Sequence, residues 1–176
     1  AEEVIADDRY LFEVPAHLSP SQAAAMPLTY LTAWQMITEK AGITPTSFDP
    51  ELPILIHGAG SGVSHALLEI LLSFGAKRIA LTSRSEENLK PWKSRGIHCF
   101  TNIDSAKEWA GKNRIAVIFD HVGEKFFESN IKLLRNGGKL IICGASSGFD
   151  AKLDLRHLFF RQLQLLGATM GSIKNF

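Results

Sequence analysis

The residues with the clearest potential for chemistry form a glycine-rich turn, residues 58–62, which reads Gly-Ala-Gly-Ser-Gly. The apolar run Ile54–Ile56 precedes the turn, and an apolar segment with helical spacing follows it. Such an arrangement binds anions, because glycines let the backbone approach a phosphate and the free N–H groups of the helix favour negative charge. An ordinary strand–helix turn can have the same sequence, so the surrounding residues must show whether this turn binds an anion.

The glycine spacing alone does not identify the anion. The strict dinucleotide fingerprint G-x-G-x-x-G needs a glycine at its sixth position, which, counted from Gly58, is Val63. As G-x-G-x-G, the turn also fits the glycine loop of S-adenosylmethionine methyltransferases. Two classes of nucleotide-like ligand therefore stay open at this point.

The end of the second strand favours one of these ligands. Proteins that bind NAD(H) or S-adenosylmethionine usually have an acid there to hold ribose hydroxyls. Here the segment Leu81–Ser85 reads Leu-Thr-Ser-Arg-Ser, and the first acid is Glu86. A carboxylate would repel a 2′-phosphate, whereas serine hydroxyls and the Arg84 guanidinium can bind one. We therefore predict NADP(H) in preference to NAD(H) or the methyl donor, against the alternative that Arg84 is a solvated loop charge.

A sheet is needed to position these residues, and the chain alternates accordingly from Pro53 onward. Apolar strand candidates are Ile54–Ile56, Arg78–Thr82, His98–Phe100, Ile115–Phe119, Lys139–Cys143 and Leu163–Ala168. Helical segments lie between most of them, around 63–74, 85–95, 104–111, 125–135 and 154–161, with a break expected at Pro91. This alternation predicts an α/β fold, a doubly wound parallel six-stranded Rossmann sheet with helices on both faces.

The expected ligand edge of this sheet is polar. Ligands lie beyond the carboxyl ends of the strands, and the five segments found there are rich in Gly, Ser, Thr or Asp: 58–64, 82–85, 120–123, 144–148 and 169–172. His121 ends the fourth strand at this edge and is the histidine of most interest. The other histidines are scattered without metal-ligand spacing, which indicates structural or surface roles.

The chain before the sheet is expected to contain two helices. Ser19-Pro20-Ser21-Gln22 is a helix start, and Pro27 is expected to end or kink that helix. A second helix is expected over about 28–41, with Gly42 as its C-cap. Two extended pieces, Val4–Ala6 and Tyr10–Phe12, are expected before them. We divide the chain into residues 1–44 and a Rossmann domain, residues 45–176.

The overall composition excludes several function classes. With a net charge of +1, the chain has no basic stripe, so nucleic acid is not an expected partner. No apolar run approaches the roughly 18 residues of a membrane span. Cys99 and Cys143 lie far apart in apolar runs, which indicates reduced core residues in a cytoplasmic protein.

A hydrolase is one alternative that the motifs raise. Residues 144–148 match the nucleophile elbow G-x-S-x-G, with Asp154 and His157 downstream. The elbow needs a helix directly after its serine, but residues 149–155 alternate like an extended segment. We therefore do not favour a hydrolase.

Several motifs in order resemble a known superfamily: 24–34 (AAMPLTYLTAW), 57–63 (HGAGSGV), 119–123 (FDHVG) and 155–160 (LRHLFF). They look like the medium-chain dehydrogenase/reductase superfamily, nearest its quinone oxidoreductase-like and zinc-type alcohol dehydrogenase-like members. Such enzymes combine a GroES-like catalytic domain with a Rossmann coenzyme domain and transfer hydride between NAD(P)H and a carbonyl, alcohol, enone or quinone-type substrate.

The resemblance implies where the cofactor lies. Pyrophosphate contacts would come from Gly60, Ser61, Gly62 and Val63, and Ser83 and Arg84 would lie by the adenosine ribose. The nicotinamide half would lie beside Thr29, Gly144, Ala145, Thr169, Met170 and Gly171. His121 is included as a cofactor-side candidate. No proton donor or other catalytic residue can be assigned.

The chain also departs from the superfamily pattern. Ser64 replaces the last glycine of the turn, and Asn88 stands where a basic residue is often found, which weakens the expected phosphate affinity. Zinc-type members have a cysteine near Thr29, so we identify no zinc ligand in this chain. The likeness starts at the end of the catalytic domain. We therefore expect residues 1–44 to be the tail of that domain with linking helices, and the isolated chain to be inert.

Two expectations concern partners and rival functions. The apolar last strand, 163–168, is predicted to pair across a two-fold axis in a homodimer, and the full-length enzyme is expected to bind a small-molecule substrate. The rivals from other classes are a methyltransferase and a non-catalytic nucleotide-binding or interaction module.

Overall fold

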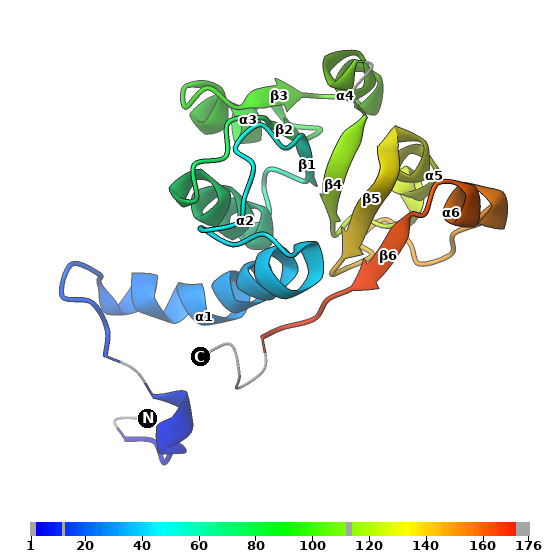
Figure 1. The fold of residues 1–176 in the computed structure, drawn as a ribbon. Helices are drawn as coiled ribbons and strands as arrows, with labels where there is room; N and C mark the ends of the chain where they lie inside the picture. The colour runs from blue at the N-terminus through cyan, green and yellow to red at the C-terminus, as the bar shows by residue number, and fades with distance from the viewer. Residues whose placement is uncertain (1–2, 12, 112–113, 172–176) are drawn as a thin grey trace.

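The computed structural model describes residues 3–11, 13–111 and 114–171 and has a parallel sheet at its centre (Figure 1). The strand order is β3-β2-β1-β4-β5-β6, and each neighbouring pair is parallel. The strands are β1 (Ile54–His57), β2 (Ile79–Thr82), β3 (His98–Phe100), β4 (Ile115–Asp120), β5 (Leu134–Ile142) and β6 (Gln164–Gly167). The direction of winding reverses between β1 and β4, which is where doubly wound sheets bind ligands. The predicted fold class is confirmed.

Helices cover both faces of this sheet, because successive strand residues point to opposite sides. Ile54 and Ile56 pack in a core with α1, α2 and α3, whereas Leu55 packs on the other face with residues of α4 and α5. The helices are α1 (Pro20–Gln35), α2 (Gly62–Ser73), α3 (Glu86–Lys93), α4 (Ile103–Ala110), α5 (Glu124–Leu133) and α6 (Leu155–Phe160). The strands are therefore buried on both faces, as their near-continuous apolar sequences predict.

Two predicted helix breaks at prolines are wrong. Helix α1 continues through Pro27 to Gln35, and α3 contains Pro91. Each proline removes a single backbone hydrogen bond, and a strong start offsets it in α1: Ser19 and Gln22 form a capping box. After Gln35 the chain continues as a π-helix, η2 (Met36–Ala41), which ends at Gly42 with φ of 73°. The predicted cap at Gly42 is confirmed.

The predicted extended pieces near the N-terminus are also not formed as strands. Residues Asp8–Tyr10 form a short 3₁₀-helix, η1, capped by Asp7. Val4 and Ile5 are exposed and join no strand of the described chain. A strand needs a neighbour for its backbone hydrogen bonds. All six strands of the sheet come from later in the chain, and none of them pairs with the described residues of this segment. Phe12 lies outside the described residues.

A buried polar network joins the carboxyl ends of the central strands. His57 Nδ1 lies 2.8 Å from Thr82 Oγ1, and His57 Nε2 lies 2.7 Å from Asn130 Oδ1. Asn130 Nδ2 donates to Asp120 Oδ2 at 3.1 Å. Since the Asn130 oxygen accepts, His57 carries its proton on Nε2 and accepts from the Thr82 hydroxyl at Nδ1. Burial lowers the pKa of His57, which keeps the ring neutral.

We predict that Asn130→Ala lowers the free energy of unfolding by about 2–4 kcal/mol, because it leaves a buried N–H of His57 and a buried oxygen of Asp120 without a partner. Urea unfolding followed by circular dichroism measures the change. The control is Asn136→Ala, an exposed asparagine on β5, which should change stability by less than about 0.5 kcal/mol. Equal effects of the two substitutions would contradict the assigned network.

Candidate functional site

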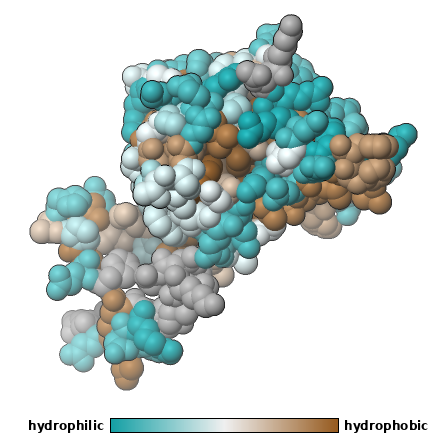
Figure 2. Space-filling model, in the orientation of Figure 1, coloured by the Kyte–Doolittle hydropathy of each residue, from teal (hydrophilic) through white to brown (hydrophobic). Residues whose placement is uncertain are grey.

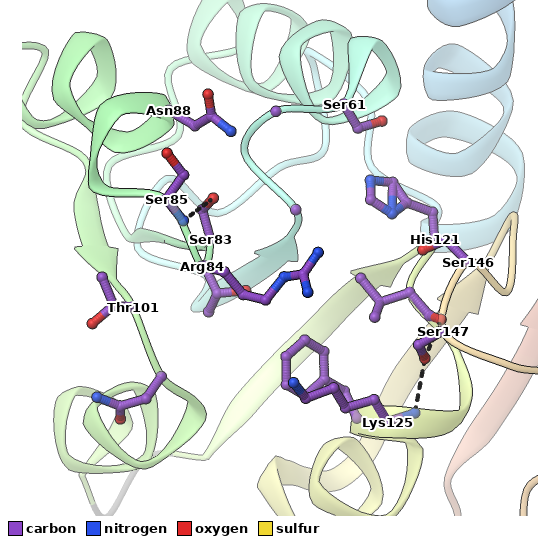
Figure 3. Close-up of a pocket in the computed structure, with 16 residues that line it drawn as sticks. Ser61, Ser83, Arg84, Ser85, Asn88, Thr101, His121, Lys125, Ser146 and Ser147 are labelled. Atoms are coloured by element: carbon purple, nitrogen blue, oxygen red, sulfur yellow. Dashed lines mark hydrogen bonds between the residues drawn. The ribbon is translucent and has the colours of Figure 1, made fainter.

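The glycine turn and the end of β2 line one cleft of about 500 Å³ at the carboxyl edge of the sheet (Figure 3). Predicted site residues that meet here are Gly60, Ser61, Ser83, Arg84 and His121. Figure 3 shows the side chains from the β2 end on one side of the cleft and Ser61 and His121 on the other. The cleft is also lined by Gly58, Thr82, Ser85, Asn88, Thr101, Asn102, Val122, Lys125, Phe126, Ser146 and Ser147.

Side chains from three other elements lie directly against the glycines of the turn. A Cβ on Gly58 would lie 2.3 Å from the His121 ring, and Gly58 has φ of +81°. A Cβ on Gly60 would lie 2.6 Å from Asn88 Nδ2, and one on Gly62 would lie 3.0 Å from Thr29 Cγ2. Glycine is therefore required at Gly58 by both its surroundings and its backbone, and a Cβ at Gly60 or Gly62 would make the neighbouring side chain shift. This is a cradle that a Cβ would fill, as close approach to a phosphate demands.

The backbone around the turn is fixed by hydrogen bonds. The N–H groups of Gly58 and Ala59 both donate to Thr82 O, at 2.9 and 3.0 Å. Ser61 caps α2, and its hydroxyl accepts from Val63 N at 3.2 Å. The N-cap of α2, Ser61, thus lines the cleft, and the positive end of the helix dipole lies beside it.

The end of β2 makes the other side of the cleft polar and positive. Ser83 N donates to Phe100 O, and Ser83 Oγ accepts from Ser85 N at 3.2 Å. Arg84 is exposed and has no ion-pair partner among the described residues. Lys125 is the second cation of the lining, and within the described ranges no Asp or Glu lines the cleft. These charges favour a ligand with phosphate groups.

Ser64, which replaces the last glycine of the expected pattern, fits into the structure with its side chain buried and hydrogen-bonded. Its side chain is buried, and Ser64 Oγ donates to His57 O at 2.9 Å. His121 Nε2 lies 3.4 Å from the same hydroxyl oxygen, which can accept because its own proton is engaged. Partial burial lowers the pKa of His121, against the opposing charge of Asp120. The histidine at the cleft is therefore neutral near pH 7.

A second cavity of about 500 Å³ lies at the ends of β5 and β6. The predicted residues Gly144, Ala145 and Thr169 line it, together with Gln35, Lys40, Ile142, Cys143, Gly167 and Ala168. The predicted residues Thr29, Gly62, Val63, Met170 and Gly171 line neither cavity. Of these, Thr29 contacts the turn only through its methyl group, since its hydroxyl lies 3.2 Å from Met26 O. Ser172 lies outside the described residues.

Some lining residues lie outside the predicted strand-end segments. Asn88 belongs to α3, and Gln35 and Lys40 come from the helical region before the sheet. Thr101 and Asn102 directly follow β3, a strand end that was not among the five predicted ligand segments. Lys125 could have been predicted from the sequence, because it stands two residues after the polar segment that follows β4. Extending each strand-end segment by one helical turn would have included it.

The elbow-like segment after β5 has a structural role. Ser147 Oγ donates to Val122 O at 2.7 Å and accepts from Lys125 N at 3.0 Å. Asp154 caps α6 and pairs with Arg156 at 2.7 Å. These contacts fix the loop. The nucleophile position of the motif is Ser146, whose N–H donates to His121 O at 3.1 Å, and the next helix, α6, begins only at Leu155. The segment thus lacks the helix that an elbow needs directly after its serine, which agrees with the sequence argument against a hydrolase.

The described residues give no metal centre. No group of three or more His, Cys, Asp and Glu within the described ranges could hold a metal ion. The described part of the chain also lacks a helix long and apolar enough to cross a membrane.

Comparisons with known proteins identify relatives of this fold and cleft. Residues 62–176 match the family described as zinc-binding dehydrogenase. A human quinone oxidoreductase is 26% identical over 178 residues, which cover 98% of this chain and 52% of that protein. Crotonyl-CoA carboxylase/reductase of Cereibacter sphaeroides is 24% identical over 192 residues, which cover 93% of this chain and 44% of that protein. This chain thus spans about half the length of these relatives.

The solved structure of an NAD-dependent alcohol dehydrogenase is also similar. It superposes with a TM-score of 0.84 at 38% sequence identity, over 97% of this chain and 50% of that one. The strand order, the family match and this superposition therefore all indicate a Rossmann-type sheet of the dehydrogenase kind.

We predict that Ser64→Gly lowers the free energy of unfolding by about 1–2 kcal/mol without tightening nucleotide binding, because it removes a buried hydrogen bond and places a glycine in a helix. Urea unfolding and calorimetric titration with NADPH measure the two effects. The intermediate variant, Ser64→Ala, should lose the hydrogen bond alone and be the more stable of the two. Tighter binding by Ser64→Gly would show instead that the serine is a defect of the turn.

Proposed function

Because this chain belongs to the zinc-binding dehydrogenase family, within the medium-chain dehydrogenase/reductase superfamily, we propose that it is the NADP(H)-binding part of an oxidoreductase. The enzyme would transfer hydride between the nicotinamide and a carbonyl, alcohol or quinone-type small molecule. Because the chain spans about half of its relatives, the activity is proposed for a longer protein. The isolated chain is expected to bind cofactor without turnover.

The observation that carries this proposal is the composition of the first cleft. A glycine cradle and the unpaired Arg84 guanidinium face one space that no carboxylate of the described chain lines. Figure 3 shows the guanidinium directed into this space, beside Ser83 and Ser85. Hydroxyls and a guanidinium suit the 2′-phosphate that distinguishes NADP(H) from NAD(H).

The residues have separate roles in this proposal. Gly60 and Ser61, with the start of α2, would hold the pyrophosphate, and Ser83 and Arg84 the adenosine phosphate. Gly144, Ala145 and Thr169 would lie beside the nicotinamide, on the other side of the strand reversal. The bound cofactor supplies hydride, while the chain supplies orientation. We assign no residue a role in zinc binding or proton transfer.

The relatives support hydride transfer with a nicotinamide cofactor, but the choice between NADP(H) and NAD(H) must be measured. The quinone oxidoreductase supports a quinone-type substrate, and the alcohol dehydrogenase supports a nicotinamide cofactor but is described as NAD-dependent. Residues 1–44 are proposed to end a catalytic domain and link it to the sheet, and a cytoplasmic location is proposed from the unpaired cysteines.

We predict that Arg84→Gln weakens NADPH binding by roughly 10- to 100-fold, the effect of losing a charged hydrogen bond to phosphate. NADH binding should change less than about twofold, because NADH lacks that phosphate. Nicotinamide fluorescence and calorimetry measure both affinities. Arg135→Gln is the matched control, since Arg135 is exposed and lies at the opposite end of the sheet.

With S-adenosylmethionine as a third ligand, three outcomes of the wild-type titration would contradict the proposal. Tightest binding to S-adenosylmethionine would favour a methyltransferase. A wild-type preference for NADH would remove the assignment of Arg84. Absence of binding to any of the three would favour an interaction module.

We also propose that the open edge of β6 forms a homodimer. Strand β6 ends the sheet order and pairs only with β5 within the described chain. Next to this strand, α6 exposes 60% of Phe159 and 74% of Phe160, and Figure 2 shows an apolar area where α6 lies in Figure 1. An open edge beside apolar surface suits a two-fold pairing.

We predict that Phe160→Lys raises the dimer dissociation constant at least about tenfold, because it would place a charge in the apolar surface beside the proposed strand pairing. Light scattering over a concentration series measures the change. Phe149→Lys is the control, since Phe149 is 87% exposed on the loop after β5 and should leave the dimer intact. A wild-type chain that is monomeric at high concentration would contradict the proposed dimer.

A further inference from the structure

Among the buried side-chain nitrogen and oxygen atoms of the described chain, one lacks a hydrogen-bond partner. It is Gln35 Oε1, on the last residue of α1. Leaving such an oxygen unpaired costs about 1–3 kcal/mol, so it calls for an explanation, such as a functional role or a bound partner. Gln35 lines the second cavity, at the ends of β5 and β6, with Gly144, Ala145 and Thr169.

Helix α1 places Gln35 on the side of the site away from the glycine turn. Earlier on the helix, Thr29 lies against Gly62 of the turn. Leu31, which shares a helix face with Gln35 at i, i+4, lies against the segment after β6, since a Cβ on Gly171 would be 2.7 Å from Leu31 Cβ. The helix therefore spans from the pyrophosphate cradle to the second cavity. The π-helix η2 begins at the next residue, Met36, and such irregularities are frequent at functional sites.

The chemistry of the missing partner follows from the proposed function, on which this inference rests. With the adenosine phosphate at Arg84 and the pyrophosphate at Gly60 and Ser61, the nicotinamide half falls beyond the strand reversal, over β5 and β6. The unpaired group is a neutral acceptor, so it requires a donor. The N–H donor of that half of the cofactor is the carboxamide on the pyridine ring. An amide oxygen and an amide N–H form a planar, directional pair.

We propose that Gln35 is a positioning residue whose Oε1 accepts a hydrogen bond from the carboxamide N–H of the nicotinamide. The contact fixes the rotation of the ring about its bond to the ribose, and so determines which face of the ring is presented to substrate. Hydride transfer depends on that orientation. Gly144 and Ala145 line the same cavity, and residues this small leave space for a flat ring.

The test uses three ligands with the wild-type chain and with Gln35→Met, which keeps the side-chain length and removes the acceptor. The ligands are NADP, its 3-acetylpyridine analogue, which lacks the carboxamide N–H, and adenosine 2′,5′-bisphosphate, which lacks the nicotinamide half. Calorimetry should show NADP binding roughly three- to tenfold weaker in the variant, the effect of losing a single hydrogen bond. The bisphosphate and the acetylpyridine analogue should bind both chains equally. Gln164→Met, the same change at an exposed residue of β6, should alter none of the affinities.

The outcomes separate this inference from the proposed function. Equal NADP binding by wild type and Gln35→Met overturns the role of Gln35 and leaves NADP binding intact. A penalty that persists with the acetylpyridine analogue overturns the acceptor role, because that ligand has no carboxamide N–H. Failure of the wild-type chain to bind the bisphosphate counts against the proposed cofactor itself. If the variant does not fold, the wild-type chain still decides, since it should bind the acetylpyridine analogue more weakly than NADP by the same factor.

Discussion

The site depends on how closely side chains approach the glycine turn after β1. Three glycines of this turn each face a side chain from a different part of the chain: His121 after β4, Asn88 on α3 and Thr29 on α1. Because these contacts leave little room for a Cβ, the narrow backbone of the turn forms the floor of the cleft, and the start of α2 adds the partial positive charge that favours a phosphate. The bonds from the turn to Thr82 O fix the ends of β1 and β2 beneath it. The turn is thus a packing centre as well as a ligand loop.

The polar network under the turn extends this constraint to the next loop. Asp120 Oδ2 accepts from Asn130, while Asp120 Oδ1 accepts from Val122 N at 2.7 Å and Gly123 N at 3.3 Å. The same carboxylate therefore joins α5 to the loop that carries His121. Ser64 lies between the His57 carbonyl and the His121 ring, and the His57 ring contacts Thr82, so hydrogen bonds connect the two sides of the cleft. Such a connection keeps the cleft in one geometry before any ligand binds.

The sheet was predictable from the sequence because its information is local. Strands buried on both faces read as short apolar runs, and the turns between them read as Gly, Ser and Asp. The errors arose where tertiary packing stabilised a structure that local sequence preferences disfavour. Pro27 is tolerated because a capping box starts α1 and the second half of this helix, including Ala33, is buried against α2 and the sheet. The contact of Asn88 with Gly60 and the unpaired Gln35 depend on elements far apart in the chain, so no local pattern contained them.

The position of β1 in the sheet has a consequence for how the chain acquires its structure. Its neighbours, β2 and β4, both come later in the sequence, and Ile54 pairs with Ile79 on one side and with Val117 on the other. During synthesis, the glycine turn therefore emerges well before the strands that support it. Parallel pairings across such sequence separations form slowly, because the intervening loops must close first. The contacts that surround the phosphate cradle come from as far along the chain as His121, so the cradle is complete only when β4 and the loop after it are in place.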